Sequence, residues 1–220
     1  ICKRRNSLER PSVSNIDQAF IITSLKSPDL STNLLDKLLV ICHINNIEPV
    51  ICLTKKDLLQ KNEYKEIKKI IKYYKHLGYK VLYNNELYRI KKCFKNKTTV
   101  FTGQTGAGKS TLLNKLDKTL NFETNEISKA LGRGKHTTRY VTLVNLAKGK
   151  VLDTPGFSAL DLSLYNDEEI KNSFIEFSKY KCPYKNCFHL KEKECEVKKQ
   201  VGKKIIKSRY DNYKKFIEKR

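Results

Sequence analysis

The sequence contains no methionine and no tryptophan, and it has only 23 Asp and Glu residues against 45 Lys and Arg residues. The shortage of acidic residues leaves a formal net charge of +22 and an isoelectric point of about 9.7. A chain this basic is typical of proteins that bind a polyanion, with nucleic acid as the first candidate. An AT-rich coding sequence, which inflates Lys, Asn and Ile, is the alternative explanation for part of the charge.

Long apolar runs are also missing. No segment approaches the roughly 18 apolar residues that cross a bilayer, and no signal-peptide pattern opens the chain. We therefore expect no membrane partner. We also expect a monomer, cytoplasmic in a bacterium or organellar in a eukaryote. Because the chain begins at Ile1 without methionine, we expect a further segment before it. The 220 residues are enough for one sizeable core and a small appendage.

The seven cysteines do not form the pattern of a secreted disulfide framework. Three of them lie in apolar or helix-like surroundings and are interpreted as core residues: Cys42, Cys52 and Cys93. The polar segment 182–195 instead has the pattern C-x4-C-x-H-x5-C. Three thiolates and one imidazole satisfy tetrahedral Zn²⁺, and four protein ligands leave no open position for catalysis. We predict one structural zinc ion bound by Cys182, Cys187, His189 and Cys195, with unligated surface cysteines as the alternative.

Short apolar segments alternate with amphipathic ones. Strand character is found in 17–25, 48–54, 79–84 and 98–103. Helical spacing of apolar residues is found in 31–46, with Ser31 as an N-cap, and in 62–77, ending at Gly78. Two further strands, 140–146 and 150–153, predict an antiparallel pair. The alternation predicts an α/β fold, a P-loop NTPase domain with a mostly parallel sheet covered on both faces.

The pattern divides the chain into three parts. Residues 1–16 are expected to be a linker, residues 17–160 a nucleotide-binding domain, and residues 161–220 a small α-helical zinc-binding domain. Within the second part, residues 119–137 are polar and contain glycine, so we expect a mobile loop there. The basic C-terminal helix interleaves Lys and Arg with tyrosines, which suits docking on the domain, RNA contact, or both.

The phosphate site is the strongest motif. GQTGAGKS at 103–110 fits GxxxxGK[ST], follows an apolar strand and opens a helix. Glycines let backbone N–H groups surround the β-phosphate, Lys109 reaches the β- and γ-phosphate oxygens, and Ser110 offers its hydroxyl to Mg²⁺. The predicted phosphate-binding residues are Gly103, Gln104, Thr105, Gly106, Ala107, Gly108, Lys109, Ser110 and Thr111.

Two downstream segments supply further candidates. In DTPG at 153–156, Asp153 can hold Mg²⁺ through water and the Gly156 N–H can sense a γ-phosphate. In GRGKHTTR at 132–139, Thr137 or Thr138 can complete the Mg²⁺ shell, and we favour Thr138 because it lies next to a strand. The alternative is a basic flexible loop whose threonines have no role. The predicted Mg²⁺ ligands are Ser110, Thr138 and Asp153.

The motif TKKD at 54–57 ends an apolar strand but lies upstream of the phosphate loop, whereas GTPases normally place their base-reading motif after it. The Asp57 carboxylate can accept hydrogen bonds from guanine N1–H and the exocyclic amine. Lys55 would lie along the base, and Thr54 replaces the usual Asn, which weakens base and loop support without abolishing it. The motif alone is weak in a lysine-rich chain, but no equivalent follows DTPG. We therefore predict nucleotide binding by Thr54, Lys55 and Asp57 in a rearranged domain, which a parallel sheet permits.

Together these motifs resemble the circularly permuted small ribosomal subunit biogenesis GTPases, the RsgA/YjeQ family. The resemblance rests on GQTGAGKSTLLN, GRGKHTTR, DTPGF, the Cys/His cluster and the closing RYDNY. It implies a circularly permuted GTPase domain, a C-terminal zinc domain and an OB-fold preceding residue 1. It also implies a GTPase that acts with the 30S subunit and its rRNA and uses GTP, Mg²⁺ and Zn²⁺. The sequence departs from the family at YNNE, 83–86, where a Ser-Ala stretch is usual.

The expected catalytic residues are His136, Lys109 and Thr138. Phe157 stands where Ras-like enzymes place a water-orienting glutamine, so we expect slow intrinsic hydrolysis. His136 is the candidate to position water after docking on the 30S subunit, and a solvent-facing loop histidine is the alternative. Two other functions stay open: a P-loop enzyme that uses ATP, and a zinc-containing RNA-binding protein with weak nucleotide turnover.

Overall fold

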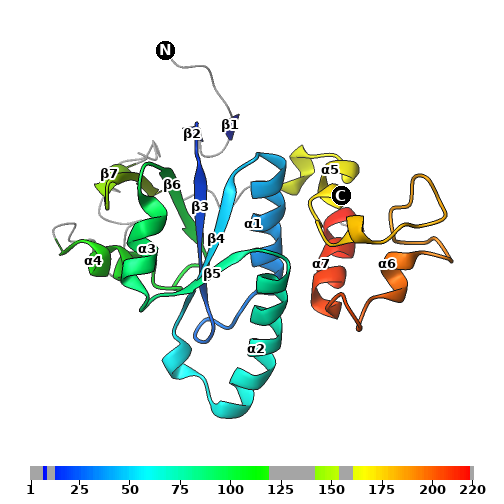
Figure 1. Cartoon of the computed structure of the whole chain (residues 1–220), viewed down its shortest axis with the longest axis horizontal. Coiled ribbons are helices and arrows are strands. Elements are labelled where there is room, and N and C mark those ends of the chain that lie inside the picture. Colours follow the sequence, from blue (N-terminus) through cyan, green and yellow to red (C-terminus); the bar gives the residue numbers. More distant parts are fainter. Residues whose placement is uncertain (1–6, 9–12, 119–141, 154–160, 219–220) are drawn as a thin grey trace, which may run out of the picture.

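The structure is a computed structural model that describes residues 7–8, 13–118, 142–153 and 161–218. Its centre is a six-stranded sheet in the order β5-β4-β3-β6-β8-β7 (Figure 1). The strands are β3 (Gln18–Ser24), β4 (Glu48–Thr54), β5 (Lys80–Tyr83), β6 (Thr98–Gly103), β7 (Thr142–Leu146) and β8 (Gly149–Asp153). All neighbouring pairs are parallel except β7–β8, which is antiparallel. Two-residue strands β1 (Ser7–Leu8) and β2 (Val13–Ser14) form a separate pair.

Helices cover both faces of the sheet. The helices α1 (Thr32–Ile44) and α2 (Lys61–His76) contribute to one apolar cluster, and α3 (Leu87–Phe94) and α4 (Lys109–Leu116) contribute to the other. Side chains of β3 alternate between the clusters: Ala19 and Ile21 belong to the first, Phe20 and Ile22 to the second. Because every residue of β3 is buried, this strand is the middle of the core. The predicted mostly parallel sheet is confirmed.

Local sequence signals explain where several elements begin and turn. The Ser31 side chain accepts a hydrogen bond from the Leu34 N–H and caps α1 as predicted. The β7–β8 hairpin turns at Ala147 and Lys148, whose φ angles of 50° and 63° fit a two-residue turn. The adjoining Gly149 is required, since a Cβ atom there would lie 1.9 Å from the Phe94 carbonyl oxygen. The helix α3 was not predicted.

The C-terminal part is built from short helices beside α1 (Figure 1). They are η4 (Leu162–Leu164), α5 (Asp167–Asn172), η5 (Phe177–Lys179), α6 (Glu196–Lys199) and α7 (Lys207–Glu218). Its aromatic residues Phe174, Phe177 and Tyr213 pack together with ring centroids 5.0–5.3 Å apart. They belong to the same apolar cluster as α1, which explains why α1 is buried on nearly all sides. The predicted boundary at residue 160 lies outside the described residues, and the three-part division stays a prediction.

Arg209 of α7 forms a fully buried ionic network that joins this C-terminal part to the sheet domain. Its Nη1 lies 2.6 Å from an Asp36 carboxylate oxygen of α1, and its Nε lies 2.8 Å from a Glu176 oxygen. The Asp36 carboxylate also accepts hydrogen bonds from the Tyr74 hydroxyl of α2 and the Asn212 amide. Every charge in the network therefore has a partner, which is the condition under which buried charges are tolerated.

We expect Arg209→Met to lower the free energy of unfolding by about 3–5 kcal/mol, because two buried carboxylates lose their counter-charge. Urea denaturation measures the change. The triple variant Arg209→Met/Asp36→Asn/Glu176→Gln should recover part of the loss, since no charge stays unpaired. The control Arg89→Met removes an arginine whose side chain is 62% exposed and paired with Glu86, and it should cost less than about 1 kcal/mol. Equal losses for Arg209→Met and Arg89→Met would contradict the proposed importance of the network.

Candidate nucleotide site and metal centre

The predicted nucleotide motifs meet at one edge of the sheet. The loop 103–110 follows β6, TKKD at 54–57 follows β4, and Asp153 ends β8. These strands are parallel, so their carboxyl ends lie at the same edge. From β3 the chain runs outward through β4 to β5 at one side of the sheet, and it then crosses to the other side of β3, where β6, β8 and β7 lie. The loop 103–110 therefore lies at the point where the strand order reverses, which is where open α/β sheets bind ligands.

The loop 103–110 has the backbone of a phosphate-binding loop. Gly103, Gly106 and Gly108 have φ angles of 137°, 75° and 90°, which favour glycine. At Gly103 the restriction is also steric, because a Cβ atom would lie 1.9 Å from the Ile22 carbonyl oxygen of β3. The Lys109 ammonium bends over the loop and donates hydrogen bonds to the carbonyls of Gly103 and Gln104, at 3.3 and 3.1 Å. This places a positive charge beside backbone N–H groups at the start of α4, an arrangement that attracts anions.

Thr54 connects the two motifs directly. Its side chain is buried, and its hydroxyl donates a hydrogen bond of 2.7 Å to the carbonyl of Ala107 in the loop. The two residues are 53 positions apart along the chain. A hydrogen bond therefore fastens the end of β4 to the loop with threonine at this position, and the weaker support expected relative to Asn stays a prediction.

A second connection runs through the segment 25–30, for which no role was predicted. Lys55 adopts a left-handed backbone conformation, with φ 55°, and its ammonium donates to the Ser27 carbonyl. The Gln104 side-chain amide donates to the Asp29 carbonyl at 3.3 Å. The segment 25–30 is thus hydrogen-bonded to both the TKKD motif at 54–57 and the phosphate loop at 103–110. Only the Pro-Asp dipeptide after a strand marked it in the sequence, and such a turn signal does not reveal its partners.

Asp57 lies in the short helix η1 (Lys56–Leu58) and is exposed to solvent. The neighbouring Lys56 ammonium lies 4.9 Å from the ring centroid of Tyr64 and 5.1 Å from that of Tyr83. Burial, followed by the hydrogen bond with Tyr64, raises the pKa of Tyr83 to about 12, so this ring stays neutral at physiological pH. The cation–π contacts of Lys56 stabilise the turn in which the Asp57 carboxylate is exposed.

Several predicted residues lie outside the described residues: His136, Thr137, Thr138 and Gly156. Ser110 and Thr111 are in the first turn of α4, beside the loop, and Asp153 is at the end of β8. The structure brings the motifs to one edge, while the individual roles of these residues stay predictions.

We expect Thr54→Val to weaken GDP binding about tenfold, because the buried Ala107 carbonyl loses its donor at a cost of about 1–3 kcal/mol. Fluorescence titration with a labelled GDP measures the affinity. The control Thr54→Ser keeps a hydroxyl and should bind within about twofold of the parent. Unchanged binding by Thr54→Val would show that this hydrogen bond does not support the site.

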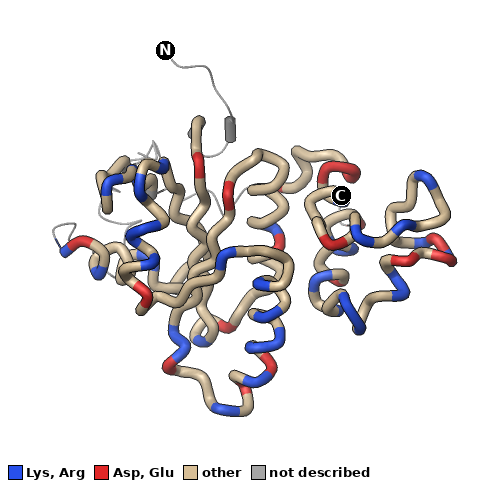
Figure 2. The backbone as a smooth tube through the Cα atoms, viewed as in Figure 1, with Lys and Arg blue, Asp and Glu red and all other residues tan. Residues whose placement is uncertain are grey.

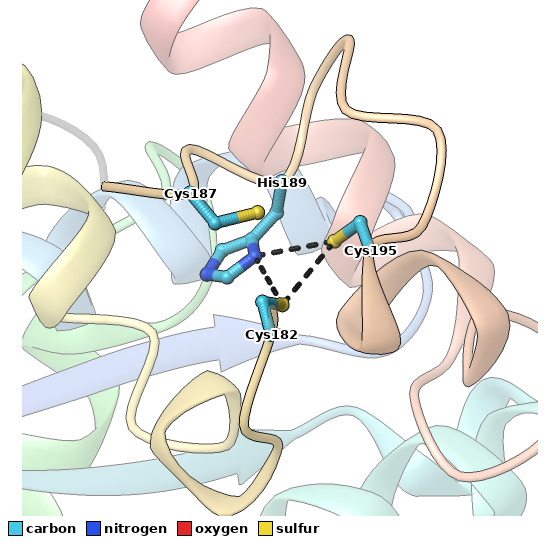
Figure 3. A group of neighbouring side chains, drawn as sticks. All are labelled: Cys182, Cys187, His189 and Cys195. Atoms are coloured by element: carbon cyan, nitrogen blue, oxygen red, sulfur yellow. Dashed lines mark hydrogen bonds between the residues drawn. The ribbon is translucent and has the colours of Figure 1, made fainter. Parts of the chain in front are cut away.

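A second site lies in the C-terminal part, where four predicted ligands converge. Figure 3 shows Cys182, Cys187, His189 and Cys195 pointing toward one another, and their ligand atoms all lie within 4.8 Å of each other. The sulfur atoms of Cys182 and Cys195 are 3.7 Å apart, and the His189 Nδ1 lies 3.6 Å from the Cys182 sulfur and 3.3 Å from the Cys195 sulfur. A disulfide would require about 2.05 Å. Bonds of about 2.3 Å from a tetrahedral zinc ion place two thiolates about 3.8 Å apart.

The protein fixes this cluster from the C-terminal helix. The Tyr210 hydroxyl of α7 donates to the His189 carbonyl at 2.6 Å, and the Tyr213 hydroxyl donates to the Phe188 carbonyl. The Glu192 carboxylate accepts hydrogen bonds from the N–H groups of Phe188 and Leu190, at 2.7 and 2.8 Å. Burial lowers the pKa of His189, which favours the neutral imidazole that binds metals. The cluster can therefore hold a metal ion.

We expect one zinc ion per chain by elemental analysis, and we expect Cys195→Ala to reduce that content at least about tenfold because three ligands remain. The control Cys93→Ala alters a buried cysteine of the sheet domain and should keep one zinc. A full zinc content in Cys195→Ala, or none in the parent, would contradict the assignment.

Comparisons with known proteins agree with this geometry. The sequence model of the RsgA GTPase family matches residues 1–163. A relative from Pediococcus pentosaceus named "Small ribosomal subunit biogenesis GTPase RsgA" is 45% identical, over 98% of this chain and 72% of its own length. One of the same name from Bacillus velezensis is 46% identical, over 99% and 77%.

Two solved structures have a similar fold. YloQ, described as a circularly permuted GTPase, has a TM-score of 0.82 and 36% identity over all of this chain and 73% of its own. YjeQ from Thermotoga maritima has a TM-score of 0.81 and 32% identity over 98% of this chain and 75% of its own. The permuted order predicted from TKKD is confirmed.

Proposed function

Because this chain belongs to the RsgA GTPase family, we propose that it binds and hydrolyses GTP in the biogenesis of the small ribosomal subunit. The proposal rests on the contact between the TKKD motif at 54–57 and the loop 103–110 at one edge of the sheet. The base motif precedes the phosphate loop in the sequence, yet Thr54 is hydrogen-bonded to Ala107. An ATP-using enzyme would need the phosphate loop but would leave Asp57 without a role.

The phosphate half of the site positions the triphosphate. The N–H groups of the loop 103–110 and the start of α4 face the phosphates, and Lys109 can turn from the loop carbonyls to the β- and γ-phosphate oxygens. Oxygen ligands from Ser110, Asp153 and Thr138 suit Mg²⁺, which neutralises developing phosphate charge when it is bound with the nucleotide. The N–H of Gly156 completes the proposed contact with the γ-phosphate.

The base half of the site selects guanine. The exposed Asp57 carboxylate is free to accept hydrogen bonds from guanine N1–H and the exocyclic amine, while the stem of Lys55 lies along the base plane. Thr54 and segment 25–30 hold this half at a fixed distance from the loop 103–110. Binding of base and phosphates to one preorganised site makes GTP the preferred nucleotide.

Hydrolysis is proposed to depend on the ribosomal subunit. Phe157 cannot orient a water molecule, so the intrinsic rate is slow. We assign His136 to the orientation of the attacking water, and we assign residues 121–138 to contact with rRNA in the 30S subunit. The zinc ion at Cys182, Cys187, His189 and Cys195 is structural, because four protein ligands close its coordination shell.

A proposal for where the chain acts follows from its relatives. In the part of the chain that the structure describes, each helix is too short or too polar to cross a bilayer. The two relatives described above are bacterial, and we propose that this chain acts as a monomer in the cytoplasm, or in an organelle if its source is eukaryotic.

We expect purified small ribosomal subunits to raise GTP turnover about tenfold or more, a fall of about 1.4 kcal/mol in the barrier. In His136→Ala most of this stimulation should disappear while GTP still binds, because the catalytic water is no longer oriented. Phosphate release measures both rates. The control His76→Ala alters an exposed histidine of α2 and should behave like the parent. If small subunits do not raise the GTP turnover of the parent, the proposed function is contradicted. If they raise the turnover of His136→Ala as much as that of the parent, the role of His136 is contradicted.

A further inference from the structure

A basic surface lies on the opposite side of the sheet from the metal centre. It is formed by α3, the end of α4 and the β7–β8 turn, where Figure 2 shows Lys and Arg gathered along α3 and its neighbours. We name it the Tyr88 surface. It comprises Tyr88, Lys91, Lys92, Lys95, Lys115, Lys118 and Lys148, all of which are exposed.

Two of the segments that form the Tyr88 surface, the end of α3 and the β7–β8 hairpin, are joined by backbone hydrogen bonds. The Asn96 N–H donates to the Lys148 carbonyl at 3.0 Å, and the Lys150 N–H donates to the Lys97 carbonyl at 2.9 Å. Gly149 lets the hairpin approach the end of α3, where no side chain would fit. The backbones that carry the lysines of α3 and of the β7–β8 turn, far apart in the sequence, are therefore held side by side.

A hollow of about 450 Å³ opens between these segments. The hollow is lined by Lys91 of α3, by Lys115 and Leu116 of α4, by Asp117 and Lys118 just after α4, and by Leu146 and Ala147 of the β7–β8 hairpin. A concave surface lined by both lysines and apolar side chains fits a ligand that has both flat apolar groups and negative charge. A nucleotide segment, with its bases and phosphates, has this chemistry.

Tyr88 supplies the second observation. The residue is 82% exposed, more than each of the other exposed large hydrophobic residues in the described part of the chain, for which the values are 47–58%. Lys91 and Lys92 follow it by three and four positions on α3, so their ammonium groups lie on the same helix face as the ring. Among the described residues, Arg89 and Lys97 have carboxylate partners, whereas no salt bridge engages a lysine of the Tyr88 surface. The ring is thus free for stacking and the ammonium groups for phosphates.

We propose that the Tyr88 surface binds a single-stranded segment of RNA in the small ribosomal subunit. A base stacks on the Tyr88 ring, and the flanking phosphates contact the lysines of α3 and α4. An acidic protein would pair with the lysines of this surface, but it would not account for the exposed Tyr88 ring. The proposal rests on the proposed function for the identity of the RNA, while the chemistry of the surface is independent of it.

The test measures binding of the full chain to purified small ribosomal subunits and to a fluorescent ten-nucleotide oligouridylate. Tyr88→Ala should weaken both about tenfold, because stacking on one base contributes about 1–3 kcal/mol. Tyr88→Phe should bind like the parent, since the ring is kept. The control Tyr184→Ala removes another exposed tyrosine, which is 47% exposed in the C-terminal part, and it should leave binding to the oligouridylate unchanged.

The lysines are tested by salt dependence. Lys91→Gln/Lys92→Gln/Lys95→Gln should reduce the slope of log affinity against log salt by about 2, because each phosphate that a lysine neutralises on a single strand adds about 0.7 to the slope. The control Lys69→Gln/Lys199→Gln/Lys214→Gln removes the same charge from lysines that have carboxylate partners. That control should keep the slope of the parent. GTP hydrolysis without ribosomal subunits should be unchanged in every variant.

The outcomes separate this proposal from the proposed function. Oligouridylate binding that Tyr88→Ala leaves unchanged overturns the Tyr88 surface, even where ribosomal subunits still stimulate hydrolysis. Equal losses in Tyr88→Phe and Tyr88→Ala overturn stacking. Loss of ribosomal subunit binding with normal oligouridylate binding indicates a protein contact and overturns the RNA assignment. If the parent binds oligouridylate through Tyr88 but ignores ribosomal subunits, the proposed function fails while the RNA-binding surface stands.

Discussion

The hydroxyl of Thr54 donates a hydrogen bond to the Ala107 carbonyl, and the nucleotide site depends on this contact. It joins the end of β4 to the loop after β6, two strands separated in the sheet by β3. The base of a nucleotide and its phosphates are separated by a fixed length, so a protein that recognises both must hold its two motifs at a matching distance. The buried threonine fixes this distance, and segment 25–30 supports it from the side through Lys55 and Gln104.

The rearranged order of the motifs determines which part of the chain follows β8. Because the base motif comes early in the chain, the strand β8 that carries Asp153 is followed directly by the C-terminal part. That part rests on α1 through the buried ion pairs of Arg209 with Asp36 and Glu176. The same helix, α7, holds the Cys/His cluster through Tyr210 and Tyr213. The Cys/His cluster, a buried ionic network and the sheet core are therefore linked through one twelve-residue helix.

The sequence was most informative where structure depends on neighbouring residues. The strand at 48–54, the N-cap at Ser31 and the phosphate loop were all predicted, because apolar runs, capping side chains and glycine spacing are local signals. Arg209 and Asp36 are 173 positions apart, and no local pattern reveals that they pair. The segment 25–30 and the Tyr88 surface were missed for the same reason. The helix α3 was missed because eight lysine-rich residues give only a short periodic pattern.

The central claim is that TKKD and the loop 103–110 form one site for a guanine nucleotide. A crystal structure with Mg²⁺ and a non-hydrolysable GTP analogue tests it most directly. The account predicts the β-phosphate among the N–H groups of the loop 103–110 and the guanine N1–H and amine within hydrogen-bond distance of the Asp57 carboxylate. A structure in which the phosphates occupy the loop while the base lies away from Asp57 would contradict it.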